Sequence, residues 1–130
     1  AKLANQLVVG ASMIAVAEAF ALGMRAGLDP KTLFQDINKS SGNCWALEKR
    51  VPVPGIVPDN PANEDFAPGF MVDLMHKDLG LVLDTARALK VPTMLAALAQ
   101  QYYAAAQAHG LGKKDFAAVS RVVNTLAAST

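Results

Sequence analysis

The feature that most constrains the fold is a proline-free opening segment that is apolar on nearly every side. From Lys2 to about Arg25, apolar residues recur at helical spacing. The few polar residues that interrupt them are Asn5, Gln6, Ser12 and Glu18. A helix of about 24 residues would be roughly 36 Å long. Because such a helix lacks a broad polar face, we expect it to run through the middle of a bundle or to be covered by a second subunit.

The rest of the chain alternates helical patterns with breaks. Residues 51–69 hold five prolines and two glycines, so a long irregular loop is expected there. Residues 30–39 follow an Asp-Pro start signal, and later helical patterns are bounded by proline, glycine and a capping aspartate. The predicted helices are Lys2 to about Arg25, Pro30 to about Lys39, Phe70 to about Leu89, Pro92 to about His109, and a last helix capped by Asp115 that ends near Ala127. The pattern predicts one all-α domain over residues 1–130, with no strand.

Composition and charge exclude several classes of partner. The formal net charge is +1 and the basic residues are scattered, so neither nucleic acid nor an anionic membrane surface is indicated. The longest apolar run, residues 7–17, is shorter than the roughly 20 residues that span a bilayer. Nothing after Lys2 resembles a signal peptide. The single cysteine, Cys44, excludes an internal disulfide and favours a reducing compartment, either a bacterial cytoplasm or a mitochondrial matrix.

The start of the long helix carries a polar motif. The sequence AKLANQ places Lys2, Asn5 and Gln6 at i, i+3 and i+4, so one helical face presents an ammonium group beside two carboxamides. A lysine whose surroundings favour the neutral amine can take a proton from an alcohol. A solvated lysine at a helix start is nevertheless the commoner case. No metal site is expected, because neither His76 nor His109 has a second ligand at metal spacing.

Further motifs follow in a recognisable order. They are SSGNCW (residues 40–45), PVPG (52–55), GF (69–70), LMHKDLGL (74–81) and KKDF (113–116). Together with AKLANQ, they resemble the β-hydroxyacid dehydrogenase family, and within it the 3-hydroxyisobutyrate dehydrogenases, over nearly the whole chain. The resemblance implies the C-terminal domain of an NAD-dependent enzyme, with a fold like the C-terminal domain of 6-phosphogluconate dehydrogenase. It also implies a separate N-terminal Rossmann domain with the glycine-rich cofactor loop, and a homodimer or homotetramer.

The resemblance implies roles for single residues as well. Lys2 matches the catalytic lysine, which takes the hydroxyl proton while a hydride leaves the same carbon for the nicotinamide. Asn5 and Gln6 match the groups that hold the substrate's hydroxyl and carboxylate, a task that suits carboxamides because they both donate and accept hydrogen bonds. Lys77 is expected near the cofactor, and Asp78 near the substrate.

Two aromatic residues complete the expected site. Phe70 precedes Lys77 by seven residues, so a helix over both would place them on one face. The resemblance puts Trp45 beside the substrate pocket, although a core or interface position is equally expected from the residue type. Some relatives have a tyrosine near the substrate where this chain has Arg50, and an arginine there could favour a second acidic group on the substrate.

The expected reaction is oxidation of a 3-hydroxy acid, such as 3-hydroxyisobutyrate, to its semialdehyde. Tartronate semialdehyde or serine-like 3-hydroxy acids are alternative substrates, because pocket details that separate such molecules are worth only about 1–3 kcal/mol. A non-enzymatic alternative is a helical dimerisation module whose polar motifs are incidental. In an enzyme, Lys2 and the Lys77-Asp78 pair should face one cleft, whereas a packing module could scatter them.

Overall fold

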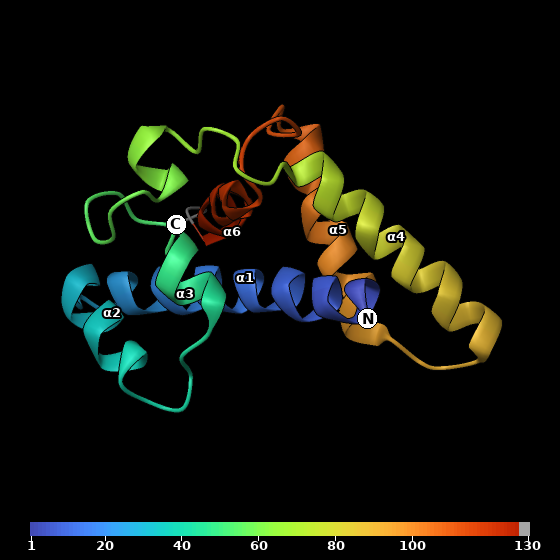
Figure 1. Cartoon of the computed structure of the whole chain (residues 1–130). Coiled ribbons are helices and arrows are strands. Elements are labelled where there is room, and N and C mark those ends of the chain that lie inside the picture. Colours follow the sequence, from blue (N-terminus) through green and yellow to red (C-terminus); the bar gives the residue numbers. More distant parts are fainter. Residues whose placement is uncertain (128–130) are drawn as a thin grey trace.

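The computed structural model describes residues 1–127 as helices packed round one long helix (Figure 1). This helix, α1, contacts α2, α3, α4, α5, α6 and the second of two short 3-10 helices. The elements are α1 (Lys2–Arg25), α2 (Pro30–Asn38), α3 (Trp45–Arg50), η1 (Pro61–Glu64), α4 (Val72–Leu89), α5 (Met94–Ala108), η2 (Phe116–Val119) and α6 (Ser120–Ala127). The predicted all-α class and the central position of the opening helix are confirmed.

Helix α1 is held in place by apolar packing and by two tyrosines of α5. Its buried side chains include Met13, Ile14 and Phe20, which belong to the main core cluster. The Tyr103 hydroxyl donates a hydrogen bond of 2.8 Å to the carbonyl of α1 residue 10. Burial, with a further contribution from the Asp115 carboxylate, raises the pKa of this hydroxyl well above its ordinary value. Glu18 is exposed, and it accepts an interhelical hydrogen bond of 2.9 Å from the Tyr102 hydroxyl.

As a whole, α1 is longer and more apolar than the run at residues 7–17 suggested. Its length and composition are sufficient to cross a membrane, and it is the one such helix in residues 1–127. The helix packs on one side against α3, α4 and α5 and on another against α6. This is the arrangement of a core helix in a globular bundle.

The predicted break after α1 is confirmed in detail. Gly27 has φ +93°, and the amide of Leu28 donates to the carbonyl of Gly23 at 2.9 Å. These are the backbone angle and the bond of a glycine-terminated helix. Asp29 then caps α2 by accepting a hydrogen bond of 3.0 Å from the amide of Thr32.

The structure differs from the sequence-based expectation in four places. A short helix, α3, occupies Trp45–Arg50, where no helix was predicted. The expected irregular loop contains η1, which Asn60 caps. The last predicted helix is divided into η2 and α6, with Asp115 capping η2 as expected. Helix α4 starts at Val72 and not at Phe70, which changes where the Phe70 ring lies.

Candidate active site

One face of the N-terminal part of α1 lines a cavity of about 540 Å³, here called the N-terminal cavity. Lys2, Asn5, Gln6 and Val9 follow at i, i+3, i+4 and i+7, the spacing that places side chains along one face of a helix. The other lining residues are Trp45, Phe70, Met75 and Phe116. The cavity therefore brings together Lys2, the two carboxamides and both aromatic residues that the sequence predicted for the site.

Lys2 is the first residue of α1 and is exposed. In the part of the chain that the structure describes, its ammonium group forms no hydrogen bond or ion pair. The Nζ atom is therefore available to a molecule that enters the cavity.

Asp78 orients the two carboxamides through a chain of hydrogen bonds. Gln6 Nε2 donates to Asp78 Oδ2 at 3.1 Å, and Asn5 Nδ2 donates to Gln6 Oε1 at 3.2 Å. Because an ionised carboxylate only accepts hydrogen bonds, Gln6 must turn its amide nitrogen toward Asp78. Its oxygen then faces Asn5, which leaves the Asn5 carbonyl oxygen for a ligand. Asp78 is only 7% exposed, and it acts on the cavity through Gln6.

Lys77 lies apart from this group. Its side chain is exposed and is not among the residues that line the N-terminal cavity. The expectation that Lys2 and the Lys77-Asp78 pair face one cleft is not met, because neither Lys77 nor Asp78 lines the N-terminal cavity. Consecutive residues of a helix point about 100° apart, which explains why Asp78 is buried while Lys77 faces solvent. The α4 residue that lines the cavity is Met75, which sequence reasoning did not single out.

The prediction that Phe70 and Lys77 share a helical face was wrong. Helix α4 begins at Val72, so Phe70 lies in the extended segment before it. Residues 71 and 115 form an isolated antiparallel bridge, and the amide of Val72 donates to the carbonyl of Lys114 at 2.9 Å. These contacts with a distant segment hold the chain extended before the helix begins. Phe70 therefore lines the cavity as predicted, but from an extended segment and not from a helix.

Three aromatic rings form the apolar wall of the cavity. The rings of Trp45 and Phe116 are stacked, with centroids 6.4 Å apart and an interplanar angle of 22°. Phe70 meets Phe116 edge-on, with centroids 6.0 Å apart. Trp45 is 48% exposed, so its side chain lines the cavity and is not buried in the core. We call Trp45, Phe70 and Phe116 the aromatic wall.

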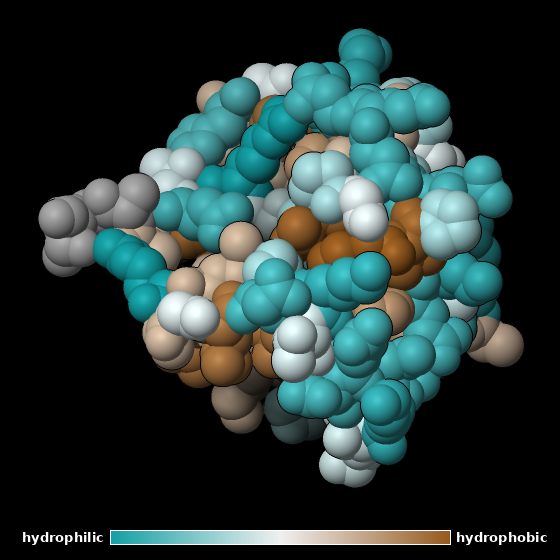
Figure 2. All heavy atoms as spheres, turned by 90° about the vertical axis from the view of Figure 1, so that its left-hand side faces the viewer, coloured by the Kyte–Doolittle hydropathy of each residue, from teal (hydrophilic) through white to brown (hydrophobic). Residues whose placement is uncertain are grey.

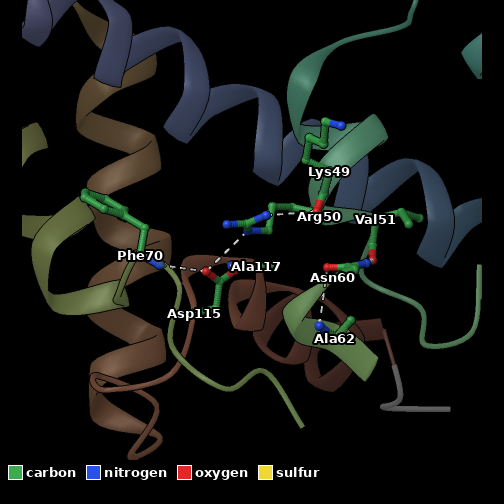
Figure 3. A network of polar contacts seen from close by, with 8 residues as sticks. All are labelled: Lys49, Arg50, Val51, Asn60, Ala62, Phe70, Asp115 and Ala117. Atoms are coloured by element: carbon green, nitrogen blue, oxygen red, sulfur yellow. Dashed lines mark hydrogen bonds and ion pairs between the residues drawn. The ribbon is translucent and has the colours of Figure 1, made fainter. Parts of the chain in front are cut away.

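The side chain of Asp115 is fully buried and contacts Arg50 and the backbone of Phe70 and Ala117 (Figure 3). Asp115 Oδ1 accepts a hydrogen bond of 2.9 Å from the amide of Phe70 and lies 3.4 Å from Arg50 Nε. Asp115 Oδ2 accepts a bond of 3.1 Å from the amide of Ala117. Sequence reasoning recognised Asp115 only as a helix cap. Its link to Arg50 depends on a contact across 65 residues, which no local pattern in the sequence indicates.

A second, larger cavity lies at the other end of α1. It has a volume of about 650 Å³ and lies between α1, residues 52–54 and α6. Its lining is mostly apolar, with Phe20, Met24 and Val53 among the larger side chains. Figure 2 views the molecule from the side of α2 and shows exposed apolar atoms between polar groups on that face. Volume alone favours this cavity, but the N-terminal cavity has the converging polar groups that fix the orientation of a ligand.

No metal site accompanies either cavity. Within residues 1–127, no group of three or more His, Cys, Asp or Glu side chains could hold a metal ion. The chemistry available in the N-terminal cavity is therefore that of one amine, two oriented carboxamides and an aromatic wall.

Comparison with known proteins identifies the family. Residues 1–123 match a family model described as the NAD-binding domain of NADP-dependent 3-hydroxyisobutyrate dehydrogenase. The chain belongs to this family. The human mitochondrial 3-hydroxyisobutyrate dehydrogenase is 45% identical over 119 residues, which cover 92% of this chain and 35% of the human protein. A probable mitochondrial enzyme of Dictyostelium discoideum is 44% identical over 124 residues, 95% of this chain and 39% of that protein.

Solved structures agree with this assignment. The 3-hydroxyisobutyrate dehydrogenase of Mycobacterium tuberculosis, described with L-serine, matches with a TM-score of 0.89 and 43% identity, over 94% of this chain and 42% of that one. The enzyme of Salmonella typhimurium matches with a TM-score of 0.81 and 36% identity, over 93% and 40%. The chain spans about a third of the length of the curated relatives. It corresponds to the all-helical C-terminal domain of 3-hydroxyisobutyrate dehydrogenase, and all the predicted site residues lie within the matched residues 1–123.

Proposed function

We propose that this domain supplies the acid-base and substrate-orienting half of the active site of an enzyme that oxidises a 3-hydroxy acid to its semialdehyde. The observation that carries the proposal is the convergence of Lys2, Asn5 and Gln6 in one cavity beside an apolar wall. Family membership supports it, because the relatives named above are dehydrogenases of 3-hydroxyisobutyrate. A packing module that contained these side chains by chance would not need Asp78 to orient Gln6.

In this reaction, the amine of Lys2 removes the hydroxyl proton as the carbon–oxygen double bond forms. A nicotinamide cofactor, when bound, would supply the acceptor for the hydride that leaves the same carbon with its electron pair. The Asn5 amide group, held by the bond to Gln6, retains a second N–H that donates to the oxygen of the substrate hydroxyl, whose one proton goes to Lys2. The aromatic wall covers the apolar part of the substrate and excludes water from it. Positioned proton transfer of this kind contributes about 10²–10⁴-fold to a rate.

The cofactor is assigned as NAD or NADP, since the family description names both. The pyrophosphate of a dinucleotide is usually held at a glycine-rich turn between a strand and a helix. Residues 1–127 contain no strand, and we propose that a separate Rossmann domain of the whole enzyme binds most of the cofactor. The exposed Lys77 is then free to contact one end of it. This division explains why Lys77 lies outside the cavity that Lys2 lines.

Substrate profiling of the full-length enzyme tests the proposed function. We expect reduction of NAD or NADP, followed by absorbance, with 3-hydroxyisobutyrate as the preferred substrate. The alternative substrates are L-serine and tartronate semialdehyde. L-Serine is named with the M. tuberculosis structure, and tartronate semialdehyde would be tested in the direction of reduction. Absence of any cofactor-dependent turnover with these acids would reject the proposal.

The 130-residue chain by itself is expected to fold but to bind the cofactor poorly. One exposed ionic contact, such as Lys77 could form, is worth only about 0–1 kcal/mol. Circular dichroism should therefore show a cooperative helical melt, while calorimetry with NAD and NADP should show no binding heat. Micromolar affinity for either cofactor would mean that the pyrophosphate site lies within these residues.

Self-association of the domain is also proposed. Apolar side chains remain exposed on α1, where Val8 is 63% and Leu22 is 74% exposed, and at the junction of α4 and α5, where Met94 is 81% exposed. Covering such side chains with a second copy is the usual way a homo-oligomer is stabilised. Sedimentation should show a dimer or tetramer at micromolar concentration, and a monomer only would contradict the proposal. The proposed location is a bacterial cytoplasm or a mitochondrial matrix, and the second is supported by relatives that are described as mitochondrial.

A further inference from the structure

Arg50 and Asp115 lie behind the aromatic wall, and neither lines the N-terminal cavity itself. The Asp115 side chain is fully buried and that of Arg50 is 17% exposed. A buried carboxylate requires a cationic partner and hydrogen bonds that replace its lost hydration. Arg50 supplies the charge at 3.4 Å, and two backbone amides supply the hydrogen bonds. The pair is therefore a fixed part of the structure and not a mobile surface contact.

Each ring of the aromatic wall is attached to this pair. The amide of Phe70 donates to Asp115 Oδ1 at 2.9 Å. Phe116 is the first residue of the 3-10 helix that Asp115 caps through Oδ2. The guanidinium carbon of Arg50 lies 5.0 Å from the centroid of the Trp45 ring, within the range of a cation-π contact. One buried ion pair thus connects three rings that come from three separate segments.

The close approach of these groups depends on a glycine. A Cβ atom at Gly69 would lie 2.9 Å from Arg50 Nη2 and 3.1 Å from Asp115 Oδ1. A side chain there would require the end of the Arg50 side chain and the Asp115 carboxylate to shift by a few tenths of an ångström. This explains physically why the GF motif at residues 69–70 belongs to the site.

We propose that Arg50 and Asp115 act as a positioning pair that fixes the aromatic wall and so determines which substituent of the substrate the cavity accepts. The proposal rests on the proposed function for the class of substrate. In this proposal Arg50 does not recognise a second acidic group, because its charge is paired with Asp115 and its guanidinium carbon lies over the ring of Trp45. Its effect reaches the substrate through Trp45, as that of Asp115 does through Phe70 and Phe116.

The test compares three variants of the full-length enzyme. Arg50→Met removes the charge but keeps most of the apolar stem, whereas Arg50→Lys keeps a charge without the planar group. Arg87→Met is the matched control, since Arg87 forms its ion pair with Asp84 at 3.5 Å on an exposed face of α4. KM and kcat are measured for 3-hydroxyisobutyrate and for 3-hydroxypropionate, which lacks only the methyl group.

We expect Arg50→Met to raise KM for 3-hydroxyisobutyrate by about 10-fold and to change kcat much less, because a misplaced wall loses contact with the methyl group. The preference over 3-hydroxypropionate should fall by a similar factor. Arg50→Lys should lie between Arg50→Met and the wild type. Arg87→Met should match the wild type. If Arg50→Met does not fold, the same KM and substrate-preference measurements are made on Arg50→Lys, which retains a cationic partner for Asp115.

A second measurement does not depend on activity. The fluorescence of Trp45, obtained as the difference from the Trp45→Phe variant, should shift to the red in Arg50→Met and be quenched more strongly by acrylamide. If no hydroxy acid is turned over, the proposed function fails while this signal still decides whether Arg50 positions Trp45.

Two results would overturn the positioning pair. The first is a wild-type KM, substrate preference and Trp45 emission in a folded Arg50→Met enzyme. The second is efficient oxidation of hydroxymethylmalonate, in which a carboxylate replaces the methyl group, by the wild type but not by Arg50→Met. That second result would assign Arg50 to direct recognition of an acidic group.

Discussion

The two ends of α1 carry cavities of similar size but different chemistry. The N-terminal cavity, of about 540 Å³, has an amine, two carboxamides and an aromatic wall. The cavity at the other end, of about 650 Å³, is lined mostly by apolar side chains. Two buried carboxylates form hydrogen bonds with residues that line the N-terminal cavity. Asp78 accepts from Gln6, and Asp115 accepts from the amide of Phe70. We propose the N-terminal cavity as the site because of its fixed polar groups and not because of its volume.

The largest effect is expected at Lys2. Lys2→Ala in the full-length enzyme should lower turnover by about 10²-fold or more, because the proton of the substrate hydroxyl loses its acceptor. Binding of the cofactor, measured by fluorescence titration, should change little. Lys31→Ala, on the exposed surface of α2 at the other end of α1, is the matched control and should keep wild-type turnover. Near-normal turnover of Lys2→Ala would remove the main chemical difference between the two cavities.

A smaller effect is expected at Asp78. Asp78→Leu removes the acceptor that orients Gln6, and a hydrogen bond to a charged group is worth about 1.5–3 kcal/mol. We therefore expect kcat/KM to fall by about 10-fold or more. Asp78→Asn retains an acceptor oxygen and should lose less. Equal activities for the Leu and Asn variants, with equal melting temperatures, would show that the chain of bonds from Asp78 to Asn5 does not orient the substrate.

The smallest effect is expected in the larger cavity. Asn124 is an exposed polar residue of its lining, and surface substitutions of this kind usually change stability by less than about 0.5 kcal/mol. Asn124→Ala should therefore leave both kcat and KM at wild-type values in steady-state assays. A clear loss of activity would mean that the larger cavity takes part in the reaction and that the contrast drawn above is mistaken.

Much of the fold could be predicted because its signals are local. The absence of proline from residues 2–25 and the glycine at position 27 define α1, and both bounds are confirmed. The short helix α3 was missed because it has only six residues and Cys44, its N-cap, makes no side-chain capping bond. The division between η2 and α6 was also missed. A single apolar stretch with one capping aspartate does not distinguish a 3-10 turn from the first turn of an α-helix.

The sequence by itself determined that Lys2, Asn5 and Gln6 share a face, because their spacing on one helix settles the matter. Only the tertiary structure decided which residues from distant segments contact them or line the same cavity. Gln6 meets Asp78 across 72 residues and Arg50 meets Asp115 across 65. The start of α4, and with it the position of Phe70, is likewise set by a bridge to residue 115. Spacing fixes neighbours within a helix, whereas contacts between distant segments arise from the packing of the whole bundle and have no period in the sequence.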